Sequence, residues 1–144
     1  SAKRREEIYA KIIRHPGIQW GIGIVSERVI DKINIFQATR LAMKKAIASL
    51  QKKTSVDFLI IDGNFPLPIN IPQKCLVKGD EKVFSCALAS IIAKVTRDRI
   101  MLAYHRKYPH YGFDRHKGYG TKFHFEILKK FGPCKIHRKS FRLA

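Results

Sequence analysis

The stretch Val56-Asp-Phe-Leu-Ile-Ile-Asp-Gly63 decides the fold class of this chain. Its first six residues are almost all apolar, which is typical of a strand that is buried on both faces of a sheet. The run stops at the turn-forming pair Asp62-Gly63. We therefore predict a buried strand over residues 56–61, with Asp62 directly at its carboxyl end.

Two further strands are predicted on either side of this one. Residues 18–25 alternate large apolar side chains with Gln or Gly, and the glycines indicate that another segment packs closely against one side. A short strand over residues 74–77 leads into Lys78-Gly79-Asp80. Three strands are few for a free-standing α/β domain of this length.

Helical patterns separate these strands. Ser1 and Thr121 are expected to cap helices that end near His15 and Gly132, and Asn34-x-x-Gln37 resembles a capping box for a helix reaching Leu50. The longest helix is predicted over residues 85–108. Its expected core stripe consists of Phe84, Leu88, Ile91, Val95 and Leu102. The alternation of helices and strands predicts an α/β fold, a sheet flanked by helices.

The charge indicates a polyanionic partner. The chain has 29 Lys and Arg against 11 Asp and Glu, a net charge of +18, which attracts nucleic acids and similar ligands. A generally lysine-rich composition is the simpler explanation and stays open. No apolar run is long enough to span a membrane, and no apolar signal region follows Ser1.

The three cysteines, Cys75, Cys86 and Cys134, form no CxxC pair. A zinc finger and a disulfide framework are therefore not expected, and a reducing compartment, the cytoplasm, is. Cys86 falls within the apolar pattern of the long helix and is expected to be a small buried side chain. The histidines show no i,i+4 pairing, which argues against a zinc site.

Asp62 and Asp80 are the candidate metal ligands, because each follows a predicted strand. Strand ends line the crevice of an α/β sheet, so neighbouring strands would bring the two carboxylates to one edge. Paired oxygen ligands in a basic protein indicate Mg²⁺ or Mn²⁺. Taken alone, each aspartate is more commonly a turn or cap residue.

Residues 116–121, His-Lys-Gly-Tyr-Gly-Thr, are a candidate nucleic-acid contact, since aromatic and basic side chains between glycines can stack on a sugar and hold phosphates. A surface loop with a buried tyrosine is about as consistent with the spacing. His137-Arg138 could bind phosphate or simply be solvated. Asp98 is expected to pair with Lys94, leaving Arg97 and Arg99 as possible substrate contacts.

In order along the chain, several stretches resemble ribonuclease HII. They are Ser1-Ala-Lys-Arg-Arg-Glu-Glu-Ile8, Ile33-Asn-Ile-Phe-Gln-Ala-Thr39, Leu59-Ile-Ile-Asp-Gly63, Val77-Lys-Gly-Asp80, Ala89-Ser-Ile-Ile-Ala-Lys-Val-Thr-Arg-Asp-Arg99, His116-Lys-Gly-Tyr-Gly-Thr121 and His137-Arg-x-Ser-Phe141. The resemblance implies one catalytic domain over residues 1–144 with an RNase H-like fold, a mixed sheet flanked by helices.

The resemblance also implies a function: metal-dependent hydrolysis of RNA in RNA–DNA hybrids, and of single ribonucleotides embedded in duplex DNA during replication and repair. The products would carry 5′-phosphate and 3′-hydroxyl ends. Asp62 and Asp80 would be catalytic metal ligands, and Tyr119 would pack on the ribonucleotide sugar. The other expected substrate-binding residues are Lys117, Gly118, Asn34, His137 and Arg138. A monomer acting away from membranes is expected.

One departure from the family pattern affects these expectations. The family's Asp-Glu-Ala-Gly-Arg-Gly motif, with two further carboxylates, has no match here, and Glu6-Glu7 lies on a charged helix instead. We therefore expect an incomplete opening sheet, weak metal binding and little or no cleavage by this chain itself. Two rivals stay open: a non-catalytic basic module of ribosomal or RNA-chaperone type, and a fragment completed by strands from another chain.

Overall fold

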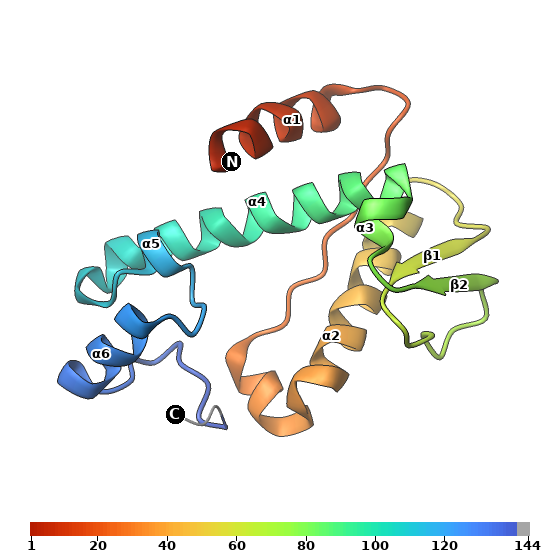
Figure 1. Ribbon diagram of the computed structural model, residues 1–144. Coiled ribbons are helices and arrows are strands. Elements are labelled where there is room, and N and C mark those ends of the chain that lie inside the picture. Colours follow the sequence, from red (N-terminus) through yellow and green to blue (C-terminus); the bar gives the residue numbers. More distant parts are fainter. Residues whose placement is uncertain (141–144) are drawn as a thin grey trace.

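The computed structural model describes residues 1–140 and shows an open, elongated arrangement of helices with a small sheet at one end (Figure 1). Phe141 and Arg142, which end the last motif and the basic tail, lie outside the described residues. The elements are α1 (Ala2–Arg14), α2 (Glu27–Gln51), β1 (Leu59–Asp62), β2 (Gln73–Leu76), α3 (Gly79–Lys82), α4 (Phe84–Lys107), the 3₁₀ helix η1 (Pro109–Tyr111), α5 (Phe113–His116) and α6 (Lys122–Phe131).

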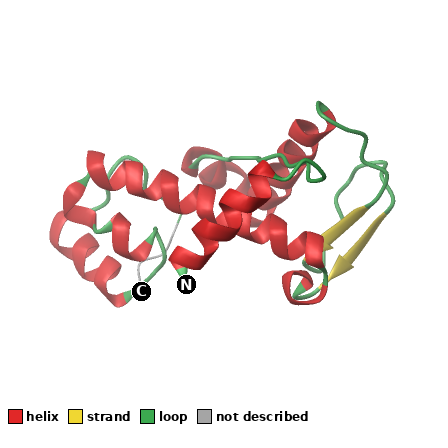
Figure 2. Ribbon diagram, turned by 90° about the horizontal axis from the view of Figure 1, so that it is seen from above, coloured by secondary structure: helices red, strands yellow, loops and turns green. Residues whose placement is uncertain are grey.

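The sheet contains β1 and β2 in parallel, with Asp62 opposite Leu76. Figure 2 shows the two strands together at one end of the molecule, with the helices occupying the rest. Gln73 secures the connection between the strands, because its side-chain amide accepts from Leu67 N at 2.7 Å and donates to Leu67 O at 2.9 Å. The predicted α/β class, a sheet flanked by helices, is confirmed.

The main core lies between α1 and α4, which run past each other in Figure 1. Tyr9 and Ile12 of α1 pack against Ile92 and Val95 of α4, and all four are buried. Burial of each such side chain contributes about 1.5–3 kcal/mol. These contacts fix α4, which also touches β1, α3, α5 and η1.

The predicted stripe of α4 is correct at its centre and wrong at its ends. Val95 is buried and Leu88 and Ile91 pack against the core, but Phe84 is 78% exposed and Leu102 is 38% exposed. Phe84 and Leu102, toward the two ends of α4, are not part of the core that α4 forms with α1.

Residues 18–25 are extended, but the predicted strand is wrong, because they pair with no strand among the described residues. Ile18, Trp20 and Ile22 pack on the core formed by α1 and α4. Two backbone carbonyls of this segment accept hydrogen bonds from lysine side chains of α2 and of the turn after it. Lys53 Nζ donates to Trp20 O at 2.9 Å, and Lys45 Nζ donates to Ile24 O at 3.4 Å.

The glycines of this segment face α2 directly, so the expectation of close packing is confirmed. A Cβ atom on Gly23 would lie 1.9 Å from Ala42 O, and one on Gly21 would lie 2.6 Å from Ala46 O. Both contacts are to helix backbone, which cannot rotate away. Only glycine allows this segment to lie against α2.

The helix caps follow the sequence. Ser1 Oγ accepts from Arg4 N, and Thr121 Oγ1 accepts from His124 N, as their positions predict. α2 is interrupted at Asn34, whose φ of 68° is non-helical. Asn34 Oδ1 accepts from Gln37 N at 3.0 Å and so restarts the helix. None of the helices over residues 1–140 has the length and apolar character needed to cross a bilayer.

Replacement of Gly23 by alanine is expected to destabilise the protein by about 1–3 kcal/mol, because the added methyl group overlaps the backbone of α2. Thermal or urea unfolding measures the change. Gly17→Ala is the matched control, since the added Cβ meets only the His15 side chain at 3.1 Å, and it should stay within about 0.5 kcal/mol of the parent. Equal effects of the two variants would contradict the packing explanation.

Candidate active site

The two candidate metal ligands lie next to each other at the carboxyl end of the sheet. Asp62 is the last residue of β1, and its Oδ1 accepts a hydrogen bond from Gly79 N at 2.8 Å. Gly79 is the first residue of α3, and Asp80 follows it. A Cβ on Gly79 would be 3.2 Å from Asp62 Cα, so the absence of a side chain lets α3 approach β1 this closely.

Cys86 of α4 lies close enough to both carboxylates for their charges to affect its thiol. It is buried, as expected, and its pKa is raised above the ordinary 9.0, first by desolvation and then by the negative charges of Asp62 and Asp80. A cavity of about 300 Å³ opens beside Asp62 and is lined mainly by Ile35, Phe36 and Met43 of α2 with Phe65. The carboxylates therefore lie between solvent and an apolar wall.

The donors at this position suit a hard divalent cation. Mg²⁺ is commonly held by one or two carboxylates, with water and substrate phosphates completing its coordination. Within residues 1–140 no group of three or more His, Cys, Asp or Glu side chains forms a metal cluster. Asp62 and Asp80 fit a site with two carboxylates, in which water and the substrate supply the other ligands.

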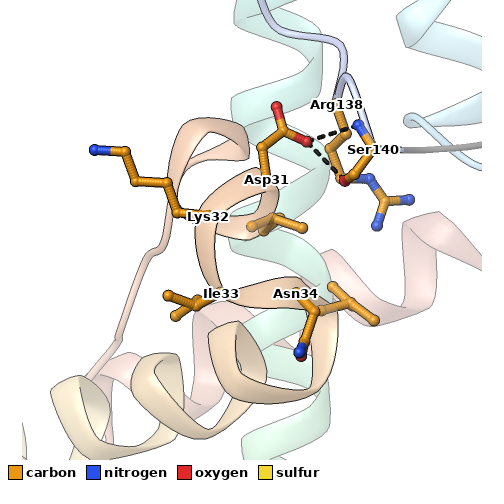
Figure 3. A pocket seen from close by; sticks show the side chains of 8 residues that line it. Asp31, Lys32, Ile33, Asn34, Arg138 and Ser140 are labelled. Carbon is orange, nitrogen blue, oxygen red and sulfur yellow. Dashed lines mark hydrogen bonds between the residues drawn. The ribbon is translucent and has the colours of Figure 1, made fainter.

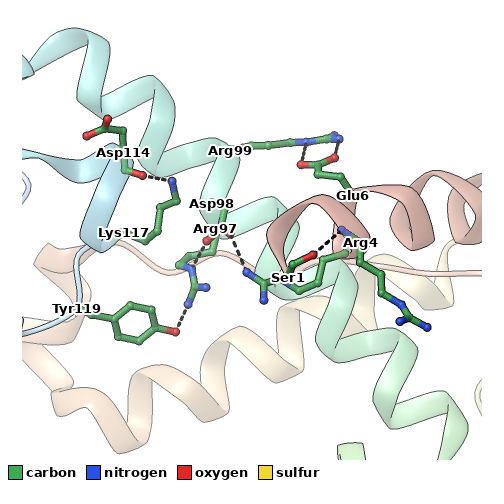
Figure 4. Close-up of polar contacts among 10 residues, drawn as sticks. Ser1, Arg4, Glu6, Arg97, Asp98, Arg99, Asp114, Lys117 and Tyr119 are labelled. Atoms are coloured by element: carbon green, nitrogen blue, oxygen red, sulfur yellow. Dashed lines mark hydrogen bonds and ion pairs between the residues drawn. The ribbon is translucent and has the colours of Figure 1, made fainter.

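The loop from Lys117 to Thr121 presents Tyr119 to solvent beside α4. Lys117 and Gly118 both have left-handed backbones, with φ of 51° and 86°. Tyr119 is 57% exposed, yet its hydroxyl accepts from Arg97 Nη1 and its ring lies 4.8 Å from the Arg97 guanidinium carbon. Figure 4 shows Arg97 reaching from α4 to the tyrosine hydroxyl. Lys117 Nζ donates to Asp114 O.

Asp98 holds Arg97 in place, and the expected partner of Asp98 is wrong. Asp98 pairs with Arg97 at 3.0 Å and with Arg5 of α1 at 3.6 Å, instead of with Lys94. Arg99 is bonded to Glu6 at 2.6 Å. Thus Arg97 points to the Tyr119 side of α4, whereas Arg99 joins α4 to α1.

Asn34 and Arg138 line a second cavity, of about 550 Å³, between α2 and the C-terminal segment. Figure 3 shows Ser140 bonded to Asp31, with Arg138 beside it and Asn34 further along the ribbon of α2. Asp31 fixes this segment, because its carboxylate accepts from Lys139 N, Ser140 N and Ser140 Oγ at 2.7–3.0 Å. The backbone N–H of Lys139, then that of Ser140, holds the pKa of Asp31 below its ordinary 3.8.

His137 lies in a cluster of imidazoles that the sequence did not predict. His116 and His124 are buried and stack with ring centroids 3.9 Å apart, and His137 Nε2 lies 2.9 Å from His124 Nε2. Phe113, which is 1% exposed, packs against all three rings. Their separations of eight and thirteen residues match no ligand spacing, but two of them flank the Lys-Gly-Tyr-Gly loop.

The expected site residues thus form separate groups along α4. From Cys86, beside the carboxylates, to Arg97, beside Tyr119, α4 runs about 16 Å at roughly 1.5 Å per residue. Asn34 and Arg138 share the cavity on α2. His137 lies behind the Tyr119 loop, with both ring nitrogens bonded to the protein.

Comparison with known proteins identifies the family. The profile described as Ribonuclease HII matches residues 1–144. The chain belongs to the ribonuclease HII family.

Ribonuclease HII proteins of several bacteria are similar to this chain. That of Chlamydia muridarum is 51% identical over 141 residues, which are 98% of this chain and 64% of the relative. That of Chlamydia trachomatis serovar A is 51% identical over 139 residues, 96% of this chain and 63% of the relative. That of Alkaliphilus metalliredigens is 48% identical over 145 residues, 98% and 70%. The chain therefore spans 63–64% of the length of the chlamydial relatives. The small sheet with flanking helices agrees with the RNase H-like fold expected for the ribonuclease HII family.

The buried imidazoles predict a loss of stability in mild acid. Desolvation, the largest cause, lowers the pKa of His116 and of His137 below the ordinary 6.5, and the neighbouring His124 lowers both further. Tyr111 O and then Asp114 oppose this for His116, and a backbone hydrogen bond with Cys134 opposes it for His137. The unfolded chain then binds protons that the folded chain does not, so stability is complete above pH 6.5 and falls as the pH drops toward the lowered values.

The melting temperature is therefore expected to fall by several degrees between about pH 7 and about pH 5.5, where histidines titrate and most carboxylates do not. Differential scanning calorimetry at fixed ionic strength measures it. Replacement of the exposed His15 by Asn should leave the pH dependence unchanged. A flat profile across this range would contradict the burial of neutral rings.

Proposed function

We propose that this chain takes part in a metal-dependent endoribonuclease activity that cleaves RNA in RNA–DNA hybrids and at single ribonucleotides embedded in duplex DNA. Without a match to the Asp-Glu-Ala-Gly-Arg-Gly motif, the chain itself is expected to cleave little or not at all. The expected products carry 5′-phosphate and 3′-hydroxyl ends. The observation that carries the proposal is the hydrogen bond from Gly79 N to Asp62 Oδ1 at 2.8 Å, because it holds Asp80 beside Asp62 in a chain of the ribonuclease HII family. The match to a family of enzymes disfavours the rival, a non-catalytic basic module.

Asp62 and Asp80 are the residues that would hold Mg²⁺ or Mn²⁺. A bound divalent ion supplies a hydroxide nucleophile and neutralises charge on the phosphate. The protein's own contribution is to fix the two carboxylates: β1 ends at Asp62, and α3 carries Asp80 up to it. Ile35, Phe36, Met43 and Phe65 form the apolar lining of the cavity beside Asp62.

Tyr119 would recognise the ribonucleotide by packing its exposed ring against the sugar. Arg97 holds the hydroxyl of Tyr119 and lies over its ring, while Asp98, which also pairs with Arg5, holds Arg97. The tyrosine therefore presents one face in a fixed orientation. Lys117 and Gly118 lie on the same loop, where the net charge of +18 favours approach of a phosphate backbone.

Asn34 and Arg138 are proposed to contact the nucleic acid. Both line the 550 Å³ cavity that Asp31 keeps in place. Cys75, Cys86 and Cys134 are free thiols, which supports the cytoplasm as the compartment of action. The expectation of a monomer stays a prediction.

Asp62→Asn and Asp80→Asn are each expected to weaken Mn²⁺ binding on the order of tenfold or more, since each removes a charged ligand. Isothermal titration calorimetry with MnCl₂ measures the affinity, and nicking of a DNA duplex with one ribonucleotide measures activity. Asp57→Asn is the matched control, because Asp57 is an exposed carboxylate two residues before β1 begins. Binding of hybrids without Mn²⁺ binding or nicking would favour the non-catalytic module.

Tyr119→Ala is expected to reduce the preference for a duplex with one ribonucleotide over the all-DNA duplex by about tenfold, roughly 1.4 kcal/mol, because the ring contact is lost. Fluorescence anisotropy with both duplexes gives the ratio of affinities. Tyr119→Phe keeps the ring and should keep most of the preference. An unchanged ratio in Tyr119→Ala would remove Tyr119 from ribonucleotide recognition.

A further inference from the structure

Three imidazoles from separate parts of the C-terminal region meet behind the Tyr119 loop. His116 ends α5, His124 lies in α6, and His137 lies in the segment after α6. His116 and His124 are 5% and 6% exposed, so their ring nitrogens depend on protein partners. All six nitrogens have one: Tyr111 O and Gly118 N for His116, Tyr119 O and His137 for His124, and His124 and Cys134 N for His137.

These partners determine where each proton lies. Cys134 N donates to His137 Nδ1 at 3.0 Å, so the proton of that ring is on Nε2. His137 Nε2 then donates to His124 Nε2 at 2.9 Å, which leaves the proton of His124 on Nδ1. His124 Nδ1 donates to Tyr119 O at 2.9 Å. Every donor in this series points toward Tyr119.

His116 fixes Gly118, the residue before Tyr119, through a hydrogen bond of its own. Gly118 N donates to His116 Nδ1 at 3.0 Å, and His116 Nε2 donates to Tyr111 O at 2.6 Å. The backbone N–H of Gly118 is therefore bonded to the His116 ring, and the backbone carbonyl of Tyr119 to the His124 ring. The backbone needs this support, because Lys117 and Gly118 occupy the left-handed region.

We propose that His124 and His137 are positioning residues that set the Tyr119 ring for ribonucleotide recognition through a directional series of hydrogen bonds from Cys134 N to Tyr119 O. The proposal rests on the proposed role of Tyr119. Neither histidine contacts the nucleic acid in this scheme. His137, expected from the sequence to bind substrate, acts through His124 and the loop backbone.

A packing role alone does not account for this arrangement. Buried imidazoles carry a desolvation cost that apolar rings of similar volume would avoid, and Phe113 already supplies such a ring at the centre. A metal site does not account for it either, because each nitrogen already has a hydrogen-bond partner and residues 1–140 contain no metal cluster. The imidazoles add a series of hydrogen bonds that all donate in one direction and end at Tyr119 O.

Amide isosteres at the two positions test the direction. The side-chain amide of Asn takes the place of Nδ1, and that of Gln takes the place of Nε2. His124→Asn keeps the donor to Tyr119 O, whereas His124→Gln keeps only the contact with His137. His137→Gln keeps the donor to His124, whereas His137→Asn keeps only the contact with Cys134 N.

Ribonucleotide preference is measured with the paired duplexes used for Tyr119→Ala, and folding is checked by circular dichroism. His124→Gln and His137→Asn are expected to lose about threefold to tenfold in preference, with affinity for the all-DNA duplex retained. His124→Asn and His137→Gln should keep it within about twofold. The proposal requires Asn to be the better replacement at position 124 and Gln the better one at position 137. A merely structural role would not produce this reversal. Equal losses, or no losses in folded variants, would therefore overturn the proposal.

Nitrogen-15 NMR of the unmodified chain provides a second measurement that needs no variant to fold. Long-range proton–nitrogen spectra should show the Nδ1–H tautomer for His124 and the Nε2–H tautomer for His137. The opposite tautomer at either ring would overturn the series. If Tyr119→Ala leaves preference unchanged, the proposed role of Tyr119 fails and the positioning role fails with it. If Tyr119→Ala reduces preference and the histidine variants do not, only the positioning role fails.

Discussion

The structure depends on the burial of Ile92 and Val95, at the middle of α4, against Tyr9 and Ile12 of α1. These contacts fix a long helix that also touches α3, α5, η1 and β1. The N-terminal part of α4 carries Cys86 to the carboxylates, and its central turns carry Arg97 to Tyr119. One apolar contact thus sets the relative placement of two groups of polar residues that the chain separates widely.

The α1 contact has a polar edge as well as an apolar centre. Arg5 reaches Asp98, and Glu6 reaches Arg99, just beyond the buried residues of the two helices. The Glu6–Arg99 pair is exposed and contributes little to stability. The effect of the Arg5–Asp98 pair is orientation, because Asp98, held by Arg5, directs Arg97 toward the tyrosine. The surface near Tyr119 is therefore ordered from α1 as well as from α4.

Local features of the fold could be predicted from the sequence, and features that depend on distant partners could not. Ser1 and Thr121 were identifiable as caps, and Asp62 and Asp80 as neighbours, because each follows from residues close in sequence or from parallel strand ends. Residues 18–25 carry a strand pattern, but the carbonyls of Trp20 and Ile24 accept from Lys53 and Lys45. The histidine cluster was missed because side-chain stacking across α5, α6 and the C-terminal segment leaves no periodic signal.

The three bonds that Asp31 accepts from Lys139 and Ser140 join residues about 108 positions apart in the chain. Closing so long a loop is entropically costly until the intervening helices have formed. We therefore expect this contact to form late in folding and to open early in local unfolding. The C-terminal segment would then report on the completeness of folding, and the cavity between it and α2 would exist only in the finished molecule.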